Sequence, residues 1–323
     1  MKSKTMMNII VFLWTVITMS AFAQNNYPSQ PIKFIVPYSP GGLPDTVARQ
    51  LSISLGQRLG QSVVVDNRPG GGGVIAAQTV KSAPADGYTF LVTDTISFNM
   101  SPITNTNLPY NPKKDFMPIA LVARAPNFLA ILPNIPASNV EEFATYVRAH
   151  PGQINYGSSG IGTPHHLAME ALKSALNLDI THVPFKGTSQ SVPALVGGQV
   201  QAVYAALPSL VGFVKTNQVK IIGVASLQPS KLAPTIPAIG QKILGYAYVH
   251  VIGIFGLSNT PPEVIKRINT ELETLANMPS TQETLTPMGI EFNIVGPVAA
   301  QKHLVDETAR LEKLIKDTKL QLQ

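Results

Sequence analysis

The chain of 323 residues contains no cysteine. This absence excludes disulfide bonds, thiolate metal sites and a cysteine nucleophile. It also excludes a lipid anchor attached to a cysteine at a signal-peptide cleavage site. Without disulfide bonds the fold relies on its hydrophobic core, and about 300 residues are enough to build one or two such cores.

Concentrated positive charge is also missing. The chain has 24 Lys and Arg against 18 Asp and Glu, a formal net charge of +6, and its densest basic point is the pair Lys113-Lys114. A nucleic-acid-binding protein needs a clustered basic face, so we expect no nucleic-acid partner. A small positive excess suits an anionic solute.

The usual cofactor and catalytic motifs are absent. Neither "SPGGLPD" (39–45) nor "RPGGGG" (68–73) has the spacing G-x-G-x-x-G, and no G-x-x-x-x-G-K-[ST] occurs. Adjacent His165 and His166 point about 100° apart on a helix and cannot easily share a metal, and H-E-x-x-H is absent. We therefore expect neither a cofactor nor a metal.

One catalytic alternative stays open at "GSSGI" (157–161). A nucleophile elbow needs G-x-S-x-G, and here Ile161 stands at the last glycine position. A secreted serine hydrolase using Ser158 or Ser159 is thus the alternative to a binding protein.

The N-terminal segment has the pattern of a secretory signal. Lys2 and Lys4 precede an apolar run over 6–19, and Ala21-Phe22-Ala23 fits the small-x-small cleavage pattern. We predict a cleaved signal peptide at 1–23 and a periplasmic mature protein. The alternative is an uncleaved membrane anchor, since the run is nearly long enough to span a bilayer.

The remaining sequence alternates β-type runs with helical stretches. Continuous apolar runs predict strands, and the alternation favours parallel sheets covered by helices on both faces. Capping-box spacing predicts helix starts at Ser138/Glu141 and Thr260/Glu263. The predicted strands are 32–36, 62–65, 88–93, 154–159, 180–185, 200–207 and 220–225, and the main predicted helices are 45–59, 74–82, 164–177 and 298–320.

Two long apolar runs, 117–132 and 248–257, are each too long for one ordinary strand. We interpret them as chain crossings between two α/β lobes, with mostly parallel sheets, in which the second lobe is inserted into the first. The predicted boundaries are 24–125 plus 250–323 for lobe 1 and 126–249 for lobe 2. Two crossings make a hinge, and the interface between lobes is a preferred place for a small-molecule site.

Two loops of similar construction occur in the two predicted lobes. "VPYSPGGLPD" (36–45) and "NYGSSGIGTPHH" (155–166) each leave a strand, pass Gly and Ser, and enter a helix with an early Pro. Helix N-termini offer free N–H groups and a positive dipole end to an anion. Asp45, in the first helical turn, balances the helix dipole, holds the loop or accepts a hydrogen bond from an amino group of a ligand.

These motifs resemble the Bug-type receptors, the substrate-binding proteins of tripartite tricarboxylate transporters. The resemblance rests on "YPSQPIKFIVPYSPGGLPDTVARQL", "VVVDNRPGGGGVIAAQTVKSAPADGYTFLV", "LPYNPKKDFMPIALVA", "GIGTPHHLAMEAL" and "HVPFKGTSQSVPALVGGQVQAVYAALPSL". It implies a two-lobe periplasmic-binding-protein (Venus-flytrap) fold without catalysis. It also implies a small carboxylate ligand and a membrane permease as partner. A sensor kinase is the alternative partner, and we expect the receptor to be a monomer.

The resemblance also implies where the ligand binds. The first lobe contributes the loop from Tyr38 to Asp45 and the segment from Thr95 to Ser97, and the second lobe contributes Gly160 to Ala168 and Pro184 to Gly187. With the hydroxyls of the two loops, the predicted ligand-binding residues are Tyr38, Ser39, Gly41, Gly42, Asp45, Thr95, Ser97, Ser158, Ser159, Gly162, Thr163, His166, Phe185, Tyr204 and Ala205.

The chain departs from these receptors at one position. Many of them carry an Asp in an "F-D-N-L-P-S" pattern, whereas this chain reads "YAALPS" with Ala205 and Ala206. Because that carboxylate favours an amino group on the ligand, its loss argues against an acidic amino acid. Tyr204 and Phe185 would then suit an aromatic or aliphatic carboxylate.

Overall fold

The computed structural model describes residues 27–105, 107–231 and 233–318. The predicted signal peptide therefore lies outside the described residues. Within the described ranges, no helix has both the length and the apolar character needed to cross a membrane.

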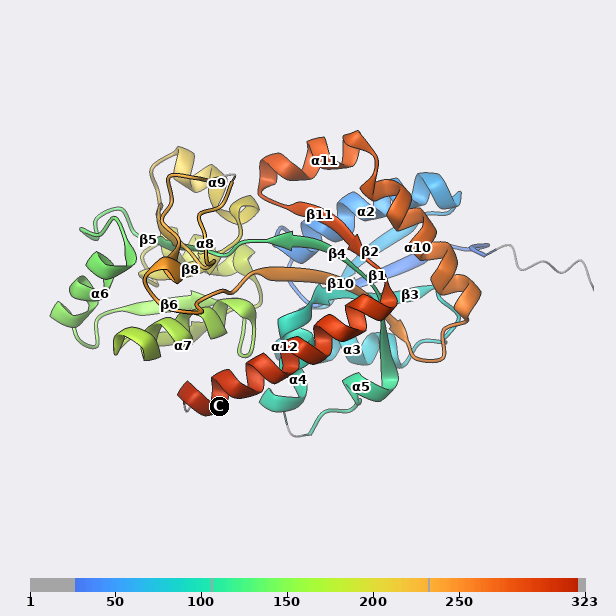
Figure 1. Cartoon of the computed structure of the whole chain (residues 1–323), viewed down its shortest axis with the longest axis horizontal. Helices are drawn as coiled ribbons and strands as arrows, with labels where there is room; N and C mark the ends of the chain where they lie inside the picture. Colours follow the sequence, from blue (N-terminus) through green and yellow to red (C-terminus); the bar gives the residue numbers. More distant parts are fainter. Residues whose placement is uncertain (1–26, 106, 232, 319–323) are drawn as a thin grey trace, which may run out of the picture.

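Two mixed sheets flanked by helices form the two lobes (Figure 1). The first sheet has the order β11-β4-β10-β3-β1-β2, and the second has the order β7-β6-β8-β5-β9. The elements of the first half are β1 (Ile32–Val36), α2 (Leu43–Leu59), β2 (Val63–Asn67), η2 (Gly71–Gly73), α3 (Val74–Lys81), β3 (Thr89–Asp94), α4 (Thr95–Thr104), α5 (Pro112–Asp115), β4 (Phe116–Ala125), β5 (Phe128–Ile131), α6 (Val140–Ala149) and β6 (Asn155–Ser158). Those of the second half are α7 (Pro164–Leu176), β7 (Thr181–Pro184), α8 (Thr188–Val196), β8 (Ala202–Ala205), α9 (Leu207–Lys215), β9 (Lys220–Val224), η3 (Ile239–Gln241), β10 (His250–Leu257), α10 (Pro262–Ala276), α11 (Pro279–Leu285), η4 (Thr286–Met288), β11 (Glu291–Val295) and α12 (Pro297–Thr318).

The predicted two-lobe α/β fold is confirmed, but the sheets are mixed rather than mostly parallel. Strand β1 pairs in parallel with β2 and β3, and β6 pairs in parallel with β7 and β8. The strands nearest the crossings, β4, β5 and β10, pair antiparallel with their neighbours. Their direction is set by where the chain enters from the other lobe, which the local apolar pattern does not reveal.

The first apolar run crosses between the lobes. Strand β4 belongs to the first sheet and β5 to the second, with only Pro126 and Asn127 between them. The second crossing lies just before β10, since the Tyr248 N–H still bonds the Ala225 carbonyl while His250 already pairs with Ala125. All eight residues of β10 are buried, which explains its uninterrupted apolar sequence.

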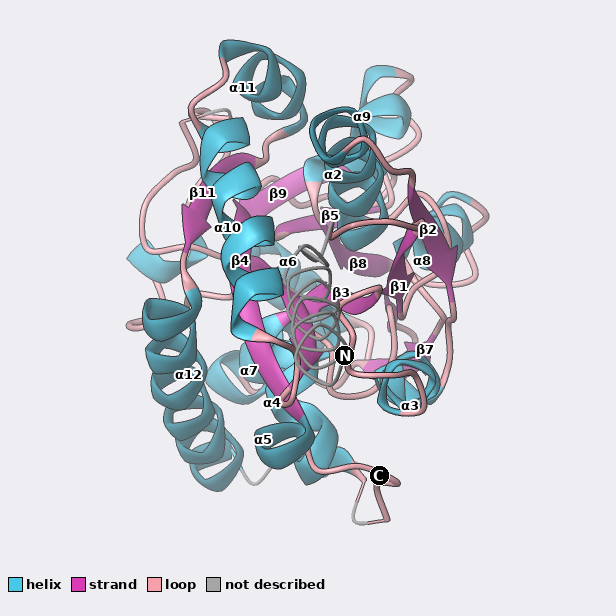
Figure 2. Cartoon of the chain, turned by 90° about the vertical axis from the view of Figure 1, so that its right-hand side faces the viewer, coloured by secondary structure: helices cyan, strands magenta, loops and turns pink. Residues whose placement is uncertain are grey.

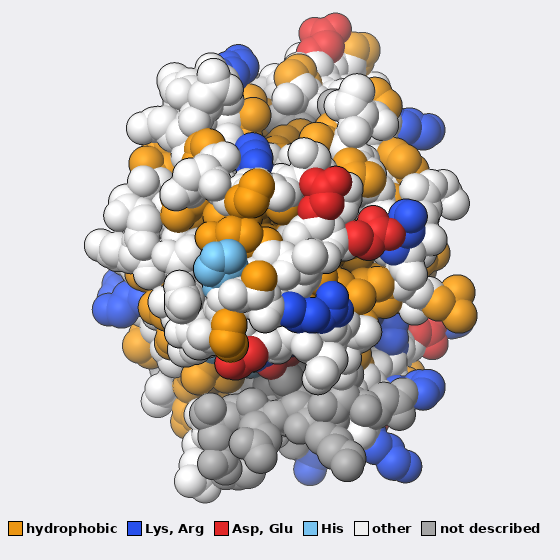
Figure 3. Space-filling model, turned by 90° about the vertical axis from the view of Figure 1, so that its left-hand side faces the viewer, with side chains coloured by type: hydrophobic (Ala, Val, Ile, Leu, Met, Phe, Trp, Pro, Cys, Tyr) orange, Lys and Arg blue, Asp and Glu red, His pale blue; other side chains and the backbone are white. Residues whose placement is uncertain are grey.

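Each sheet is covered on both faces. In the first lobe, α2 and α10 pack on one face, and α3, α4 and the first half of α12 pack on the other (Figure 2). In the second lobe, α6 and α7 cover one face and α8 and α9 the other. Figure 3 shows the outer end of the second lobe, where Lys and Arg side chains are scattered among acidic ones.

Helix α12 runs along both lobes (Figure 1). Its Leu304 packs in a core of the first lobe, whereas Leu311 packs in the main core of the second. Ile96 and Met100 of α4 join that second core as well. The two lobes are therefore in apolar contact on the side of α4 and α12.

Helix starts differ from two predictions. Helix α6 is capped by Asn139, whose side chain accepts from the Glu142 N–H, while Glu142 accepts from the Ser138 N–H. The predicted capping box is thus shifted by one residue. The predicted box at Thr260/Glu263 is wrong, because Pro261 is the N-cap of α10 and no side chain caps that helix.

Candidate functional site

Loops and helix ends of the two lobes meet at several places. The Ser39 N–H of the β1–α2 loop donates to the Lys186 carbonyl of the β7–α8 loop at 3.2 Å. A Cβ added at Gly72 would lie 3.3 Å from the Ile161 carbonyl oxygen, and one at Gly162 would lie 2.7 Å from Thr104 Cγ2. The lobes are therefore closed against each other along the predicted cleft.

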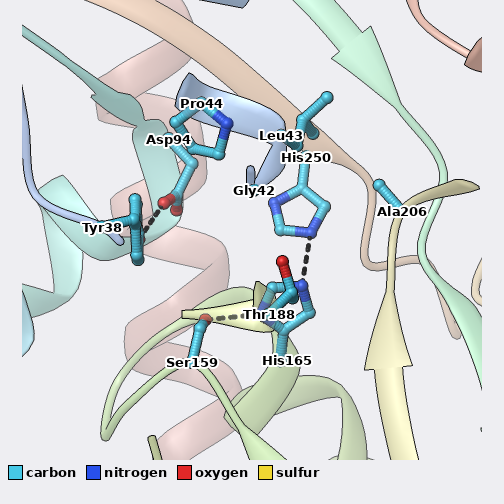
Figure 4. A pocket seen from close by; sticks show the side chains of 10 residues that line it. All are labelled: Tyr38, Gly42, Leu43, Pro44, Asp94, Ser159, His165, Thr188, Ala206 and His250. Atoms are coloured by element: carbon cyan, nitrogen blue, oxygen red, sulfur yellow. Dashed lines mark hydrogen bonds between the residues drawn. The ribbon is translucent and has the colours of Figure 1, made fainter. Parts of the chain in front are cut away.

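An inner cavity remains between the closed lobes (Figure 4). The space left inside is about 10 Å³, which is room for roughly one water molecule. It is lined from both lobes and from the second crossing by Tyr38, Gly42, Leu43, Pro44, Asp94, Ser159, His165, Thr188, Ala206 and His250.

Three helices begin at this cavity without a side-chain cap. Their N-caps are Gly42 for α2, Gly187 for α8 and Ala206 for α9, and in none of the three helices does an N-cap side chain accept a hydrogen bond from the first turn. The first N–H groups of a helix have no partner within the helix, and the helix dipole is positive there. Pro44 in α2 and Pro208 in α9 have no N–H, so the free donors at the cavity are the other first-turn N–H groups of these helices and those of α8. This arrangement is suited to a carboxylate.

Asp94 lies at the end of β3 and is only 1% exposed. Its side chain caps α4 by accepting from the Ser97 N–H at 2.7 Å, and it also accepts from the Tyr38 hydroxyl. Burial, and then the nearby Asp94 carboxylate, raise the pKa of Tyr38 well above its ordinary value, so this hydroxyl keeps its proton and donates. The first lobe thus presents a carboxylate to the cavity.

A chain of hydrogen bonds links the second lobe to the hinge (Figure 4). Ser159 Oγ lies 2.5 Å from His165 Nδ1, and His165 Nε2 lies 3.1 Å from His250 Nε2. His250 Nε2 is also 3.0 Å from Asn127 Oδ1 in the first crossing. Burial lowers the pKa of His165 well below its ordinary value and lowers that of His250 to about 4, so both rings are neutral at neutral pH.

An outer cavity of about 690 Å³ lies next to the inner one and shares Tyr38 and Ser159 with it. Small-molecule sites usually measure ~300 to 1,000 Å³, so the outer cavity has the size of a ligand site. Its lining adds the cation Lys186 and the aromatic ring of Phe185. The full lining is Pro37, Tyr38, Gly70, Gly71, Gly72, Gly73, Thr104, Asn105, Ser159, Gly160, Ile161, Pro184, Phe185, Lys186 and Gln190.

Part of the predicted site is brought together at these cavities. Tyr38, Gly42 and Ser159 line the inner cavity, and Phe185 lines the outer one. Ser39 lies beside them in the contact with Lys186.

Other predicted residues of the first lobe support the site from behind. Asp45 accepts from the Gly41 N–H, from Arg49 and from Asn67, so its carboxylate holds the loop. Burial would raise the pKa of Asp45, but these hydrogen bonds outweigh it and lower the pKa below its ordinary value. In α4, the Ser97 hydroxyl lies 2.7 Å from the Tyr38 hydroxyl, and Thr95 is fully buried.

The predicted residues of the second lobe likewise shape the β6–α7 loop. Ser158 Oγ lies 2.7 Å from His182 Nε2, and the Thr163 hydroxyl donates to the Gly160 carbonyl. His166 accepts from the Gly162 N–H and stacks on His182. None of these side chains is among those that line the inner cavity.

Tyr204 and Ala205 do not line either cavity. Both are fully buried in β8, and the Tyr204 hydroxyl lies 2.8 Å from the Tyr246 hydroxyl inside the second lobe. Ala206, one residue further along the chain, lines the inner cavity instead.

Sequence reasoning missed Asp94, Thr188 and His250 as cavity residues, and it included His165 only within the loop 160–168. Asp94 directly precedes Thr95, which was predicted, and Thr188 follows the predicted turn ending at Gly187. The sequence pattern of the histidines bears on metal binding only and does not indicate a place in the cavity. Among the described residues, no group of three or more His, Asp or Glu side chains is placed to hold a metal ion.

Two α/β lobes, two crossings and a cavity between the lobes define a solute-binding protein of the periplasmic type. The chain belongs to the tripartite tricarboxylate transporter family of receptors, because the model of that family matches residues 47–320. The predicted resemblance is thereby confirmed, and an extracytoplasmic location follows from the family.

Relatives match over nearly the whole chain. A UPF0065 protein of Bordetella pertussis (strain Tohama I) is 33% identical over 328 residues, which cover 100% of each chain. The solved structure of the periplasmic binding protein BugD has a TM-score of 0.87 and 29% identity, covering 92% of this chain and 100% of its own. R. palustris Rpa4515, solved with adipate, has a TM-score of 0.85 and 29% identity, covering 91% and 98%.

Proposed function

We propose that this protein is an extracytoplasmic receptor that captures a small carboxylate between its lobes for a tripartite tricarboxylate-type permease. The observation that carries this proposal is the convergence of three uncapped helix starts, from α2, α8 and α9, on one interlobe cavity. Free backbone N–H groups at positive helix ends bind carboxylates without a cationic side chain. The adipate-bound relative, which is 29% identical, supports the same ligand class.

Capture requires the lobes to part. The inner cavity has room for about one water molecule, which is less than any dicarboxylate needs. The two crossings, at Pro126-Asn127 and just before His250, are the segments about which the lobes rotate. We propose the domain boundaries 24–125 plus 250–323 and 126–249, a division supported by the strands of the two sheets.

For the ligand-binding residues, we propose Tyr38, Ser39, Gly42, Ser159 and Phe185 from the predicted set, together with Asp94, Thr188 and His250. We further propose that residues 1–23 are cleaved after export and that the mature receptor is a monomer. Size-exclusion chromatography with light scattering tests the last point, because a mass of two chains would contradict it. Whether a sensor kinase also uses this receptor is tested by pull-down with the ligand-loaded protein.

The serine hydrolase alternative finds no support in the comparisons, and the geometry does not favour it. Ser159 contacts His165, but the other ring nitrogen of His165 meets His250 rather than a carboxylate. Burial lowers the pKa of His182, the partner of Ser158, to about 3. A general base works best with a pKa near the operating pH, so neither serine has an effective base.

A thermal-shift and calorimetry panel of carboxylates tests the proposed function. A ligand that binds only the folded protein stabilises it by RT ln(1 + [L]/Kd), so C3 to C8 mono- and dicarboxylates are compared at one concentration. The expected result is stabilisation by at least one acid, which is recovered unchanged. Turnover of the acid that is lost in Ser159→Ala would favour the hydrolase.

The variant Gly42→Ala tests the site. Gly42 has φ −80°, which alanine adopts without strain, and its new Cβ would lie 3.3 Å from Thr188 Oγ1 between the lobes. We expect affinity to fall by roughly tenfold or more, about 1.4 kcal/mol, with the unliganded melting temperature unchanged. The matched control is Gly212→Ala on the exposed face of α9, where a Cβ meets nothing within 4 Å. Equal affinity of Gly42→Ala and Gly212→Ala would contradict this site.

A further inference from the structure

The inner cavity contains a carboxylate that an anion-binding site does not need. Asp94 is 1% exposed, and its carboxylate accepts hydrogen bonds from the Ser97 N–H and the Tyr38 hydroxyl. The ten residues that line the cavity include no Lys or Arg. Burying a carboxylate without a cation is costly, and a cation brought by a ligand would compensate that cost.

A second acceptor faces the same space. His250 Nε2 lies 3.0 Å from Asn127 Oδ1, and because an amide oxygen only accepts, Nε2 carries the ring proton. Nδ1 of the neutral ring is then a lone-pair acceptor, and it is buried without a hydrogen-bond partner among the described residues. In Figure 4 this free nitrogen lies on the side of the ring that faces Asp94. A buried polar atom without a partner requires an explanation.

The two acceptors lie in the same small cavity as the free donors. Asp94 and His250 come from the first lobe and the second crossing, whereas Thr188 and Ala206 mark the helix starts of the second lobe. A cavity with free donors and with a carboxylate acceptor matches a group that carries both charges. The outer cavity of about 690 Å³ leaves space for the rest of such a ligand.

We propose that the ligand carries a protonated amine as well as its carboxylate, and that Asp94 and His250 Nδ1 receive this amine while the helix starts receive the carboxylate. The inference rests on the proposed function and specifies its ligand. The alanine at position 205 does not argue against an amine, because this residue lines neither cavity. Asp94 supplies the missing carboxylate from the first lobe.

The variant Asp94→Asn tests the proposal and keeps an N-cap side chain at the start of α4. Asparagine is as good an N-cap as aspartate, and its amide oxygen still accepts from Ser97 N–H or from Tyr38. The substitution removes the negative charge. The matched control is Asp66→Asn, which removes one charge from an exposed pair with Arg68.

Each probe series keeps one carbon skeleton and changes one substituent. The dicarboxylates are glutamate, 2-hydroxyglutarate and glutarate, and the aromatic acids are phenylalanine, 3-phenyllactate and 3-phenylpropionate. Calorimetry on the mature protein should give, in the series that binds, the tightest affinity for the amino member. In Asp94→Asn we expect this member to lose about 10- to 100-fold in affinity, the range of a charge-assisted hydrogen bond, while the unsubstituted acid changes little.

The outcomes separate this inference from the proposed function. If the hydroxy or unsubstituted acid binds as tightly as the amino member, or if Asp94→Asn keeps the order of affinities, the amine subsite is overturned and the carboxylate receptor stands. If no member of either series binds while other carboxylates without an amine do, the subsite is likewise overturned. If no carboxylate binds at all, both proposals fail together.

Discussion

The main-chain N–H of Ser39 in the first lobe donates to the main-chain carbonyl of Lys186 in the second, at 3.2 Å. This hydrogen bond joins two loops that are 147 residues apart in sequence. It places the start of α2 against the start of α8, so that the free N–H groups of both helices reach one cavity. Closure of the lobes therefore assembles the donors that the proposed ligand requires.

The contact between Gly162 and Thr104 offers a test of closure. Gly162 has φ +76°, and an added Cβ would lie 2.7 Å from Thr104 Cγ2 of the first lobe. Gly162→Ala adds roughly 1 kcal/mol of backbone strain in every state, and it adds a clash only when the lobes close. Because ligand binding and closure are linked, we expect affinity to fall beyond the effect on stability.

A double variant separates the two effects. Thr104→Ser removes the clashing methyl group and keeps the hydroxyl that donates to the Met100 carbonyl. We expect Gly162→Ala/Thr104→Ser to regain most of the affinity but none of the lost stability, as measured by calorimetry and urea unfolding. An unchanged affinity defect in the double variant would mean that Gly162 acts through its own loop.

Asp45 gives a prediction for stability. Its carboxylate accepts from the Gly41 N–H at 2.9 Å, from Arg49 and from Asn67. Asp45→Asn should cost about 1–3 kcal/mol at pH 7, because buried donors lose an acceptor. The control Asp66→Asn, in an exposed pair, should cost roughly 0.5 kcal/mol or less.

The pH dependence of that effect has a definite sign. Since the folded pKa of Asp45 is lowered, its contribution is present above the unfolded pKa of about 3.9 and is lost as the pH falls through the folded value. The difference between wild type and Asp45→Asn in urea unfolding should therefore shrink between pH 5 and the acid limit of folding. A difference that grows on acidification would contradict this role.

The lobes and their loops were predictable because apolar runs and the Gly/Pro loops that follow them are local features of the sequence. The run at 32–36 ends in the loop that carries Tyr38 and Gly42, and the structure places β1 and α2 around it as expected. The direction of β10 and the position of His250 were not predictable, because they depend on where the chain re-enters the first lobe. Local apolar sequence does not encode that long-range pairing.

The same distinction applies to the site. Asp94 has a local role as the N-cap of α4. From the sequence, an N-cap aspartate that also lines a ligand cavity cannot be told from one that does not. Its place in a ligand cavity follows from lobe closure, which brings Thr188 and Ala206 opposite it. Tyr204 is the opposite case: its place near a family motif suggested a role in ligand binding, but its side chain packs in the core of the second lobe.

Glu307 of α12 gives a second prediction for how stability depends on pH. Burial raises the pKa of this carboxyl to about 7, Asp94 contributes in the same direction, and Arg310 opposes it. The folded pKa of Glu307 lies above its unfolded value of about 4.3. The contribution of this group to stability is therefore fully present below pH ~4.3, and it is lost as the pH rises to about 7. The loss amounts to about 3–4 kcal/mol.

Glu307→Gln should remove this dependence and leave the hydrogen bond from Asn99 in place. Relative to wild type, the variant is expected to gain stability between pH 5 and pH 8, as measured by urea unfolding across that range. Glu312→Gln, an exposed change on the same helix, is the control and should show no such gain. A difference between wild type and Glu307→Gln that is constant with pH would contradict the raised pKa.

Tyr204 and Tyr38 have opposite roles that a pair of phenylalanine variants distinguishes. The Tyr246 hydroxyl donates to the Ala168 carbonyl, so the Tyr204 hydroxyl donates to Tyr246 inside the second lobe. Tyr204→Phe should lower stability by about 1 kcal/mol and leave ligand affinity unchanged. Tyr38→Phe removes the hydroxyl that donates to Asp94 at the cavity and should weaken binding by roughly tenfold. Calorimetry with the tightest acid of the panel measures both, and an affinity loss in Tyr204→Phe as large as that in Tyr38→Phe would return Tyr204 to the ligand site.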